Sequence, residues 1–554
     1  MRSLFKRPLF KARGSGLAPL FILPLFAFLP LNVSSQRRER LIDTWKPLHY
    51  EVKIALNDQL SEITSAVTKV QVVILKNNVS TIDLDFGDLT INAVKVGGVA
   101  AQFERKPERL NVLLAAPAMR GDKLDINVNY HGRPKDGLVL TTDREGKPSA
   151  TGDNWPNRVH HWIPSLDHPS AKATVTFTVT APARDLVVAN GAFAGSTSES
   201  ATTRTWTFNE TRPIPPYCMV IVVNEGARID VPGAVTPLSY YVPQLDRAYA
   251  IKGFAPAPQS LSLFSQIVGP YPYEKLAMIV GATRFGGMEN SSAIVFSSNV
   301  FVPNPKARLS EKYGIPVGIV DVVAHEIAHQ WFGDSVTEAT WADLWLSEGF
   351  ATYYAGVFIQ RYESEEAFQR YMSQAAETYL AYWKRNPTPI FDRNTEDLFK
   401  LLNGNNYQKG AWVLHMLRSR LGDDAFFRGV RDYYNSHRDS IATSEDLRMA
   451  LERASGKKLK VFFDRWIYGS GHPVYELSST QARAGSLTLV LKQVQVAEAF
   501  LDPVIIEVTA GETKKRLTMR PRNKLETLSL KIKGSPTTIV VDPDGNLLKE
   551  VVSK

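Results

Sequence analysis

The residues of this chain best suited to chemistry are two histidines and a glutamate within residues 325–329, which read His-Glu-Ile-Ala-His. They lie in an apolar stretch, 317–332, whose pattern predicts a buried helix. Histidines four residues apart share one helical face, so His325 and His329 could bind one metal ion together. Glu326 would project beside them, where a general base for a metal-activated water is needed. The pattern predicts a zinc hydrolase.

A third metal ligand is expected because catalytic zinc sites use three protein ligands and one open position. Glu348 follows within a second apolar stretch, 341–353, which also predicts a helix. A carboxylate surrounded by aromatic residues and leucine needs a partner, which disfavours a surface position. We therefore expect Glu348 to complete a site for one Zn²⁺ per chain. Asp343 is expected either to orient a ligand or to interact with a helix N-terminus.

The elements that must position these residues divide the chain into three parts. Residues 36–236 alternate apolar and polar positions, which predicts an N-terminal antiparallel β domain. Residues 237–472 change to a helical period and predict a mainly helical domain that holds the motif. Residues 473–554 return to short strands and predict a small immunoglobulin-like β-sandwich, so the chain is a multidomain α+β protein. The clearest alternating segments are 50–56, 123–130, 172–180, 203–208, 486–492 and 504–509, and the clearest amphipathic ones are 364–383, 408–421 and 444–454.

Composition and charge limit the classes of partner. Hydrophobic residues make up 44% and charged residues 22% of the chain, as in soluble globular proteins. The formal net charge is +9, but five of the basic residues fall in the first 35 residues, which contain no acid. The remaining excess is too small for a nucleic-acid surface, which needs basic residues clustered on one face. We expect no nucleic-acid partner.

Residues 1–35 have the composition of a secretory signal peptide. A basic stretch precedes an apolar run at 17–31, which is short for a membrane span and is interrupted by three prolines. Small residues at 33–35 offer a cleavage position. The pattern predicts an exported protein, periplasmic or extracellular, with no membrane span after leader removal. An uncleaved membrane anchor is the alternative.

Cys218 is the single cysteine of the chain, so no internal disulfide can form. It lies in an apolar, strand-like run at 216–223, which favours a buried core thiol over a nucleophile. An exported chain of this length without disulfides suits a bacterial periplasm.

Two further motifs indicate which kind of zinc hydrolase this chain resembles. Residues 284–290 read Arg-Phe-Gly-Gly-Met-Glu-Asn, and residues 407–411 read Tyr-Gln-Lys-Gly-Ala. Together with residues 325–329 and Glu348, they make the chain resemble the aminopeptidase N family of zinc metallopeptidases, the gluzincins that include leukotriene hydrolase. The resemblance spans nearly the whole mature chain. It implies a β saddle, a thermolysin-like catalytic domain and a small β-sandwich, in that order.

The resemblance also implies roles for individual residues. Glu289 would bind the free α-amino group of the substrate, which makes the enzyme an exopeptidase. Tyr407 would donate a hydrogen bond to the oxyanion that develops in the transition state. The backbone of the glycine-rich motif would lie along the substrate like an added strand. The remaining substrate-binding residues of this motif are Gly286, Gly287, Met288 and Asn290, with Gly287 in a position where the family usually has alanine.

A second contact to the α-amine is missing from its usual place. In the family, a Gln or Glu precedes a Pro-x-x-Asp-x-Pro segment, which is present here at residues 164–169. Residues 152–156 contain neither Gln nor Glu. Asp153 could substitute, although a loop aspartate more commonly shapes a turn.

These observations predict a zinc-dependent aminopeptidase that releases N-terminal residues from peptides by zinc-activated water attack. Glu326 would take the proton of the water and pass it to the leaving amine. The alternatives are a zinc endopeptidase with the same metal site, an epoxide hydrolase like leukotriene hydrolase, and a non-enzymatic receptor or adhesion module. The preferred N-terminal residue, the physiological peptide and the oligomeric state do not follow from the sequence.

Overall fold

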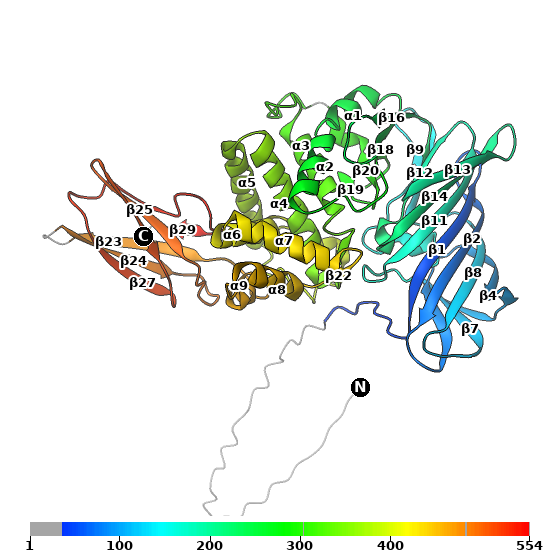
Figure 1. Ribbon diagram of the computed structural model, residues 1–554, viewed down its shortest axis with the longest axis horizontal. Coiled ribbons are helices and arrows are strands. Elements are labelled where there is room, and N and C mark those ends of the chain that lie inside the picture. The colour runs from blue at the N-terminus through cyan, green and yellow to red at the C-terminus, as the bar shows by residue number, and fades with distance from the viewer. Residues whose placement is uncertain (1–35, 303, 482–484, 553–554) are drawn as a thin grey trace, which may run out of the picture. The chain divides into compact units, whose positions relative to one another are not determined.

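The computed structural model describes residues 36–302, 304–481 and 485–552, and the predicted leader at 1–35 lies outside them. Strands come first along the described chain, a largely helical part follows, and strands return at the end (Figure 1). This order confirms the predicted multidomain α+β architecture. Within the described residues, no helix is both long enough and apolar enough to cross a bilayer.

The first β-rich part is built around an eight-stranded sheet in the order β13-β14-β11-β1-β2-β8-β4-β5. Its strands alternate buried and accessible positions, so one face packs into a core of aliphatic and aromatic side chains. The sequence predicts an antiparallel domain, and the pairings of this sheet are antiparallel except that β1 pairs with β11 in parallel. The long connection between these two strands permits this direction. The strands are β1 Trp45–Leu56, β2 Ile63–Ile74, β4 Thr90–Val96, β5 Val99–Ala100, β8 Lys123–Gly132, β11 Ala173–Pro182, β13 Ala192–Ser198 and β14 Thr203–Ile214.

Two smaller sheets complete this part, in the orders β3-β7-β6 and β12-β15-β10-β9. Strand β10 leads directly into the loop that carries Asp153 and Trp155. The strands are β3 Val79–Asp85, β6 Phe103–Lys106, β7 Arg109–Ala118, β9 Leu138–Thr142, β10 Pro148–Gly152, β12 Leu186–Ala189 and β15 Ile221–Asn224.

The central part combines a five-stranded sheet, β16-β17-β18-β20-β19, and a two-stranded sheet, β21-β22, with a set of helices (Figure 1). Strand β19 lies at the edge of the five-stranded sheet and carries Gly287 and Met288, so one side of its backbone is not paired with another strand. The strands are β16 Ala227–Val231, β17 Leu238–Val242, β18 Leu276–Gly281, β19 Gly287–Met288, β20 Ala293–Ser297, β21 Val336–Glu338 and β22 Ser440–Ala442, and the helices are α1 Arg247–Gly253, α2 Ala257–Ile267, α3 Val317–His329, α4 Trp345–Tyr362, α5 Glu365–Trp383, α6 Gly410–Leu421, α7 Asp423–His437, α8 Ser444–Ser455 and α9 Lys460–Trp466.

The last part is a sandwich of two sheets, β27-β24-β23-β29 and β26-β25-β28. Alternate residues of β24 and β25 are buried, and these side chains join the same apolar core as the central helices. The strands are β23 Val474–Gln481, β24 Ser486–Gln493, β25 Val504–Ala510, β26 Thr513–Met519, β27 Leu525–Lys531, β28 Thr538–Val541 and β29 Glu550–Val552.

The structure differs from the sequence-based elements in three places near the site. The predicted helix at 341–353 is a 3₁₀ turn, Trp341–Asp343, followed by α4. The helix predicted from residue 408 begins with a π turn, Asn405–Lys409, which sets Tyr407 apart from α6. Cys218 ends a short 3₁₀ turn rather than lying in a strand, because prolines precede it, and its thiol is buried as expected.

Candidate metal site and peptide cleft

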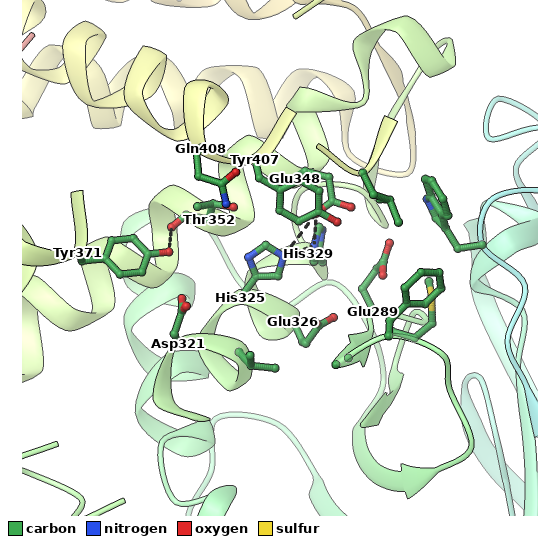
Figure 2. A pocket seen from close by; sticks show the side chains of 17 residues that line it. Glu289, Asp321, His325, Glu326, His329, Glu348, Thr352, Tyr371, Tyr407 and Gln408 are labelled. Atoms are coloured by element: carbon green, nitrogen blue, oxygen red, sulfur yellow. Dashed lines mark hydrogen bonds and ion pairs between the residues drawn. The ribbon is translucent and has the colours of Figure 1, made fainter. Parts of the chain in front are cut away.

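The three predicted metal ligands converge where α3 packs against α4 (Figure 2). The Nε2 atoms of His325 and His329 lie 3.0 Å apart. Each lies 3.4 Å from Oε2 of Glu348. The one-turn spacing on α3 brings the imidazoles to one face, and α4 supplies the carboxylate from the facing helix.

These distances fit a tetrahedral zinc site. With zinc–ligand bonds of about 2.0 Å, the edges of the tetrahedron measure about 3.3 Å, close to the three observed separations. Oε2 of Glu348 is fully buried and has no conventional hydrogen-bond partner. A buried carboxylate oxygen that faces two imidazole nitrogens matches the donor set of two histidines and one glutamate. His325, His329 and Glu348 are thus the residues that would hold the ion.

His329 is oriented by groups behind it. Its Nδ1 lies 3.1 Å from the carbonyl oxygen of Phe332 and 3.0 Å from Oγ of Ser347. These contacts hold the ring so that Nε2 points toward the ligand cluster. The adjacent Gly333, at φ +117°, leaves room for the Ser347 hydroxyl, which a Cβ there would meet at 2.3 Å. Ser347 was not predicted, although its place beside Glu348 in the sequence is a signal that could have found it.

The electrostatics of the cluster favour a bound cation. Burial opposes a charge on Glu348, but the imidazoles of His329 and His325 outweigh it and lower the pKa of Glu348 to about 2. Burial also opposes a charge on His329, but Glu289 and Glu348 raise the pKa of its imidazole to about 10. Several carboxylates therefore concentrate negative charge around the position that an ion would take.

Glu326 lies beside the ligands and faces strand β19. Its Oε2 is buried without a hydrogen-bond partner, and burial, reinforced by Glu289 and Glu348, raises the pKa of its carboxyl group well above the usual value. A Cβ on Gly287 would lie 2.4 Å from Oε1 of Glu326. Because residue 287 has no side chain, the Glu326 carboxylate has room in the cleft. The carboxylate of Glu326 can accept and release a proton there.

Glu289 occupies the end of the cleft next to His329 (Figure 2). A carboxylate oxygen of Glu289, one of Glu326 and a ring nitrogen of His329 all lie within 4.8 Å of one another. Burial is the main cause that raises the pKa of Glu289 to about 7. Its backbone is held by Gln330, whose Nε2 donates to the carbonyl oxygen of Glu289 at 2.7 Å. Gln330, which directly follows the histidine motif, was not predicted.

Tyr407 lines the cleft on the side of α6. Its ring stacks on that of His325, with centroids 5.9 Å apart and planes 2° from parallel. Burial and the nearby Glu348 carboxylate raise the pKa of the phenol well above its usual value. The hydroxyl therefore keeps its proton and can donate a hydrogen bond beside the metal ligands.

The cleft that joins these groups has a volume of about 330 Å³. Apolar side chains surround Glu289, with the rings of Trp155 and Phe285 packed edge to face. Polar side chains lie beyond His325. The lining residues are Trp155, Phe285, Gly286, Gly287, Met288, Glu289, Asp321, Val322, His325, Glu326, His329, Glu348, Thr352, Tyr371, Leu402, Tyr407 and Gln408.

Two predicted substrate-binding residues do not line the cleft. The carboxylate of Asp153 is buried against Arg158 at 3.0 Å and Arg284 at 3.3 Å, and it also accepts from Thr283. Asn290 is buried and donates to the carbonyl oxygen of Met288. The Asp153 carboxylate is thus paired with two arginines. Its role in binding the substrate amine remains a prediction from the sequence.

Asp343 does not contact the histidine ligands. Its Oδ1 accepts hydrogen bonds from the backbone nitrogen of Ser444 at 3.0 Å and from the Ser444 hydroxyl at 2.6 Å. Ser444 is the first residue of α8, so the carboxylate stabilises the N-terminus of that helix. Of the two expectations for Asp343, the structure supports the interaction with a helix N-terminus.

Comparison with known proteins identifies the class to which this fold and site belong. Residues 46–218 match the peptidase M1 N-terminal domain, and residues 257–466 match the peptidase family M1 domain. The chain belongs to the M1 peptidase family, which confirms the resemblance drawn from the motifs.

Relatives of the chain include proteins named as aminopeptidases. It is 26% identical to aminopeptidase 2 of Candida albicans over 80% of this chain and 49% of that protein. It is 29% identical to probable aminopeptidase 2 of Sulfurisphaera tokodaii over 71% and 50%. The chain thus spans about half the length of these curated relatives. An M1 zinc metallopeptidase from Deinococcus radiodurans shares its fold with a TM-score of 0.64 at 23% identity, covering 78% of this chain and 95% of that one.

Proposed function

We propose that the protein is a zinc-dependent aminopeptidase that releases N-terminal residues from peptides. The observation that carries the proposal is the position of Glu289, a buried carboxylate that closes the cleft next to His329. A carboxylate there pairs with an ammonium group and places the first peptide bond over the metal ligands. The enzyme therefore requires a free N-terminus and cleaves the first peptide bond after it. The aminopeptidase relatives support this assignment.

Each step follows from the residues that line the cleft. A zinc ion held by the three ligands, one per chain, would polarise the first peptide carbonyl and lower the pKa of a water molecule. Glu326 takes the proton of the attacking water and delivers it to the leaving amine. Tyr407, which keeps its proton, donates a hydrogen bond to the carbonyl oxygen as negative charge develops there. Gly286 and the edge strand β19, Gly287–Met288, lie along the substrate.

The experiment that tests this function is a panel of aminoacyl fluorogenic amides, assayed with the purified protein before and after treatment with a chelator. The proposal predicts hydrolysis that the chelator abolishes and that added Zn²⁺ restores. Hydrolysis of none of the panel, or hydrolysis that persists after complete metal removal, would contradict it. Zinc content should approach one equivalent per chain.

We propose further that the protein acts outside the cytoplasm. The basic and apolar composition of residues 1–35 supports an export signal. Expression of the full chain in bacteria, followed by fractionation and N-terminal sequencing of the mature protein, tests this. An intact leader on protein recovered from the cytoplasm would contradict the proposal.

A further inference from the structure

The end of the cleft beyond His325 is lined by polar side chains that the proposed reaction does not use. They are Asp321 from α3, Thr352 from α4, Tyr371 from α5 and Gln408 beside Tyr407 (Figure 2). In contrast, Trp155, Phe285 and Met288, which also line the cleft, pack together in one apolar cluster, and Met288 directly precedes Glu289 in the chain. The two ends of the cleft therefore differ in the side chains that they can accept.

The polar end lies where the second residue of a bound peptide must lie. Asp321 stands one turn before His325 on α3, a rise of about 6 Å along the helix axis. Thr352 stands one turn after Glu348 on α4, so both helices lead away from the ligands to this same end. Glu289 lies at the other end, beside His329. A peptide whose amino group meets Glu289 and whose first peptide bond meets the ligands places its next side chain here.

One of the polar groups at this end, the hydroxyl of Thr352, has no hydrogen-bond partner. The hydroxyl of Tyr371 donates its proton to the carbonyl oxygen of Thr352 at 2.9 Å and also lies within hydrogen-bond reach of the Asp321 carboxyl group. Oγ1 of Thr352 is buried without a hydrogen-bond partner, and the residue is 6% exposed. An unpartnered, buried hydroxyl that lines a cleft costs free energy until a ligand supplies a partner.

Asp321 adds a negative charge to this end of the cleft. Among the residues that the structure describes, no lysine, arginine or histidine forms an ion pair with it, and its polar neighbour is Tyr371. Burial raises the pKa of the carboxyl group to about 6. A cation brought by the substrate would offset this cost of burial, whereas a second carboxylate would increase it.

The chemistry that fits is a positively charged side chain rich in hydrogen-bond donors. The guanidinium of arginine offers five N–H donors in one plane, and the ammonium of lysine offers three. Acidic side chains are disfavoured because Asp321 and Glu348 repel them.

We propose that Asp321, Thr352 and Tyr371 form a binding site for a basic side chain at the second position of the substrate. Resting on the proposed aminopeptidase function, this inference adds the class of peptide on which the enzyme acts, namely those with arginine or lysine after the residue that is released.

The test compares two peptides that differ only in the guanidinium group, Leu-Arg-Ala and Leu-citrulline-Ala, with release of leucine measured by mass spectrometry. Citrulline keeps the shape of arginine and loses its charge. We expect kcat/KM to be on the order of tenfold higher for the arginine peptide, as for one hydrogen bond to a charged group. Equal kcat/KM values for the two peptides with the unmodified enzyme would by themselves contradict the inference.

The variant that assigns the preference is Asp321→Asn, for which the ratio of the two kcat/KM values should fall close to one. Glu377→Gln is the matched control, because Glu377 is an exposed acid on α5 that does not line the cleft. The control should keep the ratio of the unmodified enzyme. A ratio that falls equally in both variants, or in neither, would contradict the assignment to Asp321. If neither peptide is cleaved, the proposed function itself fails, which is a different outcome from cleavage without preference.

Discussion

Gly287 packs directly against the side chain of Glu326, since a Cβ at residue 287 would lie 2.3 Å from Cδ of Glu326. The position of the proposed general base, Glu326, therefore depends on the absence of a side chain at residue 287 on strand β19.

Substitution of Gly287 by alanine should displace the Glu326 carboxylate. We expect Gly287→Ala to lower kcat by roughly tenfold or more, since proton transfer depends on sub-ångström placement of the base. Steady-state kinetics on an aminoacyl amide measures the effect. Gly318→Ala is the matched control, because a Cβ there meets nothing within 4 Å, and it should leave kcat unchanged. Equal kcat for Gly287→Ala and the native enzyme would show that the packing of Gly287 against Glu326 has no role in catalysis.

Replacement of Glu326 by glutamine removes the proton acceptor and keeps the shape of the side chain. Glu326→Gln should lower kcat by a factor of roughly 10²–10⁴, the usual contribution of a general base. Zinc content should stay that of the native protein, because Glu326 is not one of the three ligands. Near-native turnover in a fully zinc-loaded Glu326→Gln protein would exclude Glu326 as the base.

Tyr407→Phe tests the hydrogen bond to the developing oxyanion. We expect kcat to fall by roughly 10²–10³ with KM little changed, because the bond strengthens in the transition state. The ring that stacks on His325 is retained, so zinc content should not change. A rise in KM with constant kcat would instead indicate that Tyr407 contributes to ground-state binding.

Some of the architecture follows from the sequence because it is local. The one-turn spacing of His325 and His329, with Glu348 in the next apolar stretch, predicts the ligand cluster that the structure brings together. The strands around Tyr50 and Val504 follow from alternation, and the helix at 444–454 follows from its period. These features depend on patterns within a few residues of one another.

The rest could not be predicted because it depends on contacts between distant segments. Trp155 and Tyr371 reach the cleft from elements separated in sequence by more than 200 residues, and nothing local marks either. The sequence offers Asp153 as a candidate for the amine site, and its contacts with Arg158 and Arg284 become visible only in the folded chain. The interaction of Asp343 with the first residue of α8 likewise joins two separate segments.

A buried histidine gives the stability of the protein a defined pH dependence. Burial, with Arg418 nearby, lowers the pKa of His415 to about 4, while an unfolded chain titrates near 6.5. The unfolded state therefore binds the extra proton between these values, so stability present above about pH 6.5 is lost as the pH falls toward 4. The full difference corresponds to about 3 kcal/mol.

The variant that isolates this effect is His415→Gln, which stays neutral throughout. Free energies of unfolding from denaturant titrations should fall less steeply between pH 6.5 and pH 4 in the variant than in the native protein. Identical slopes for the two proteins would show that His415 titrates normally in the fold.

The central claim is that Glu289 makes a metal-dependent hydrolase cleave only from a free N-terminus. The direct measurement is the hydrolysis of one peptide in two forms, with a free and with an acetylated N-terminus, by the native enzyme and by Glu289→Gln. We predict stepwise release of N-terminal residues from the free peptide alone, with KM for that peptide raised at least tenfold in the variant. Cleavage of the acetylated peptide at internal bonds by the native enzyme would contradict the account and identify an endopeptidase.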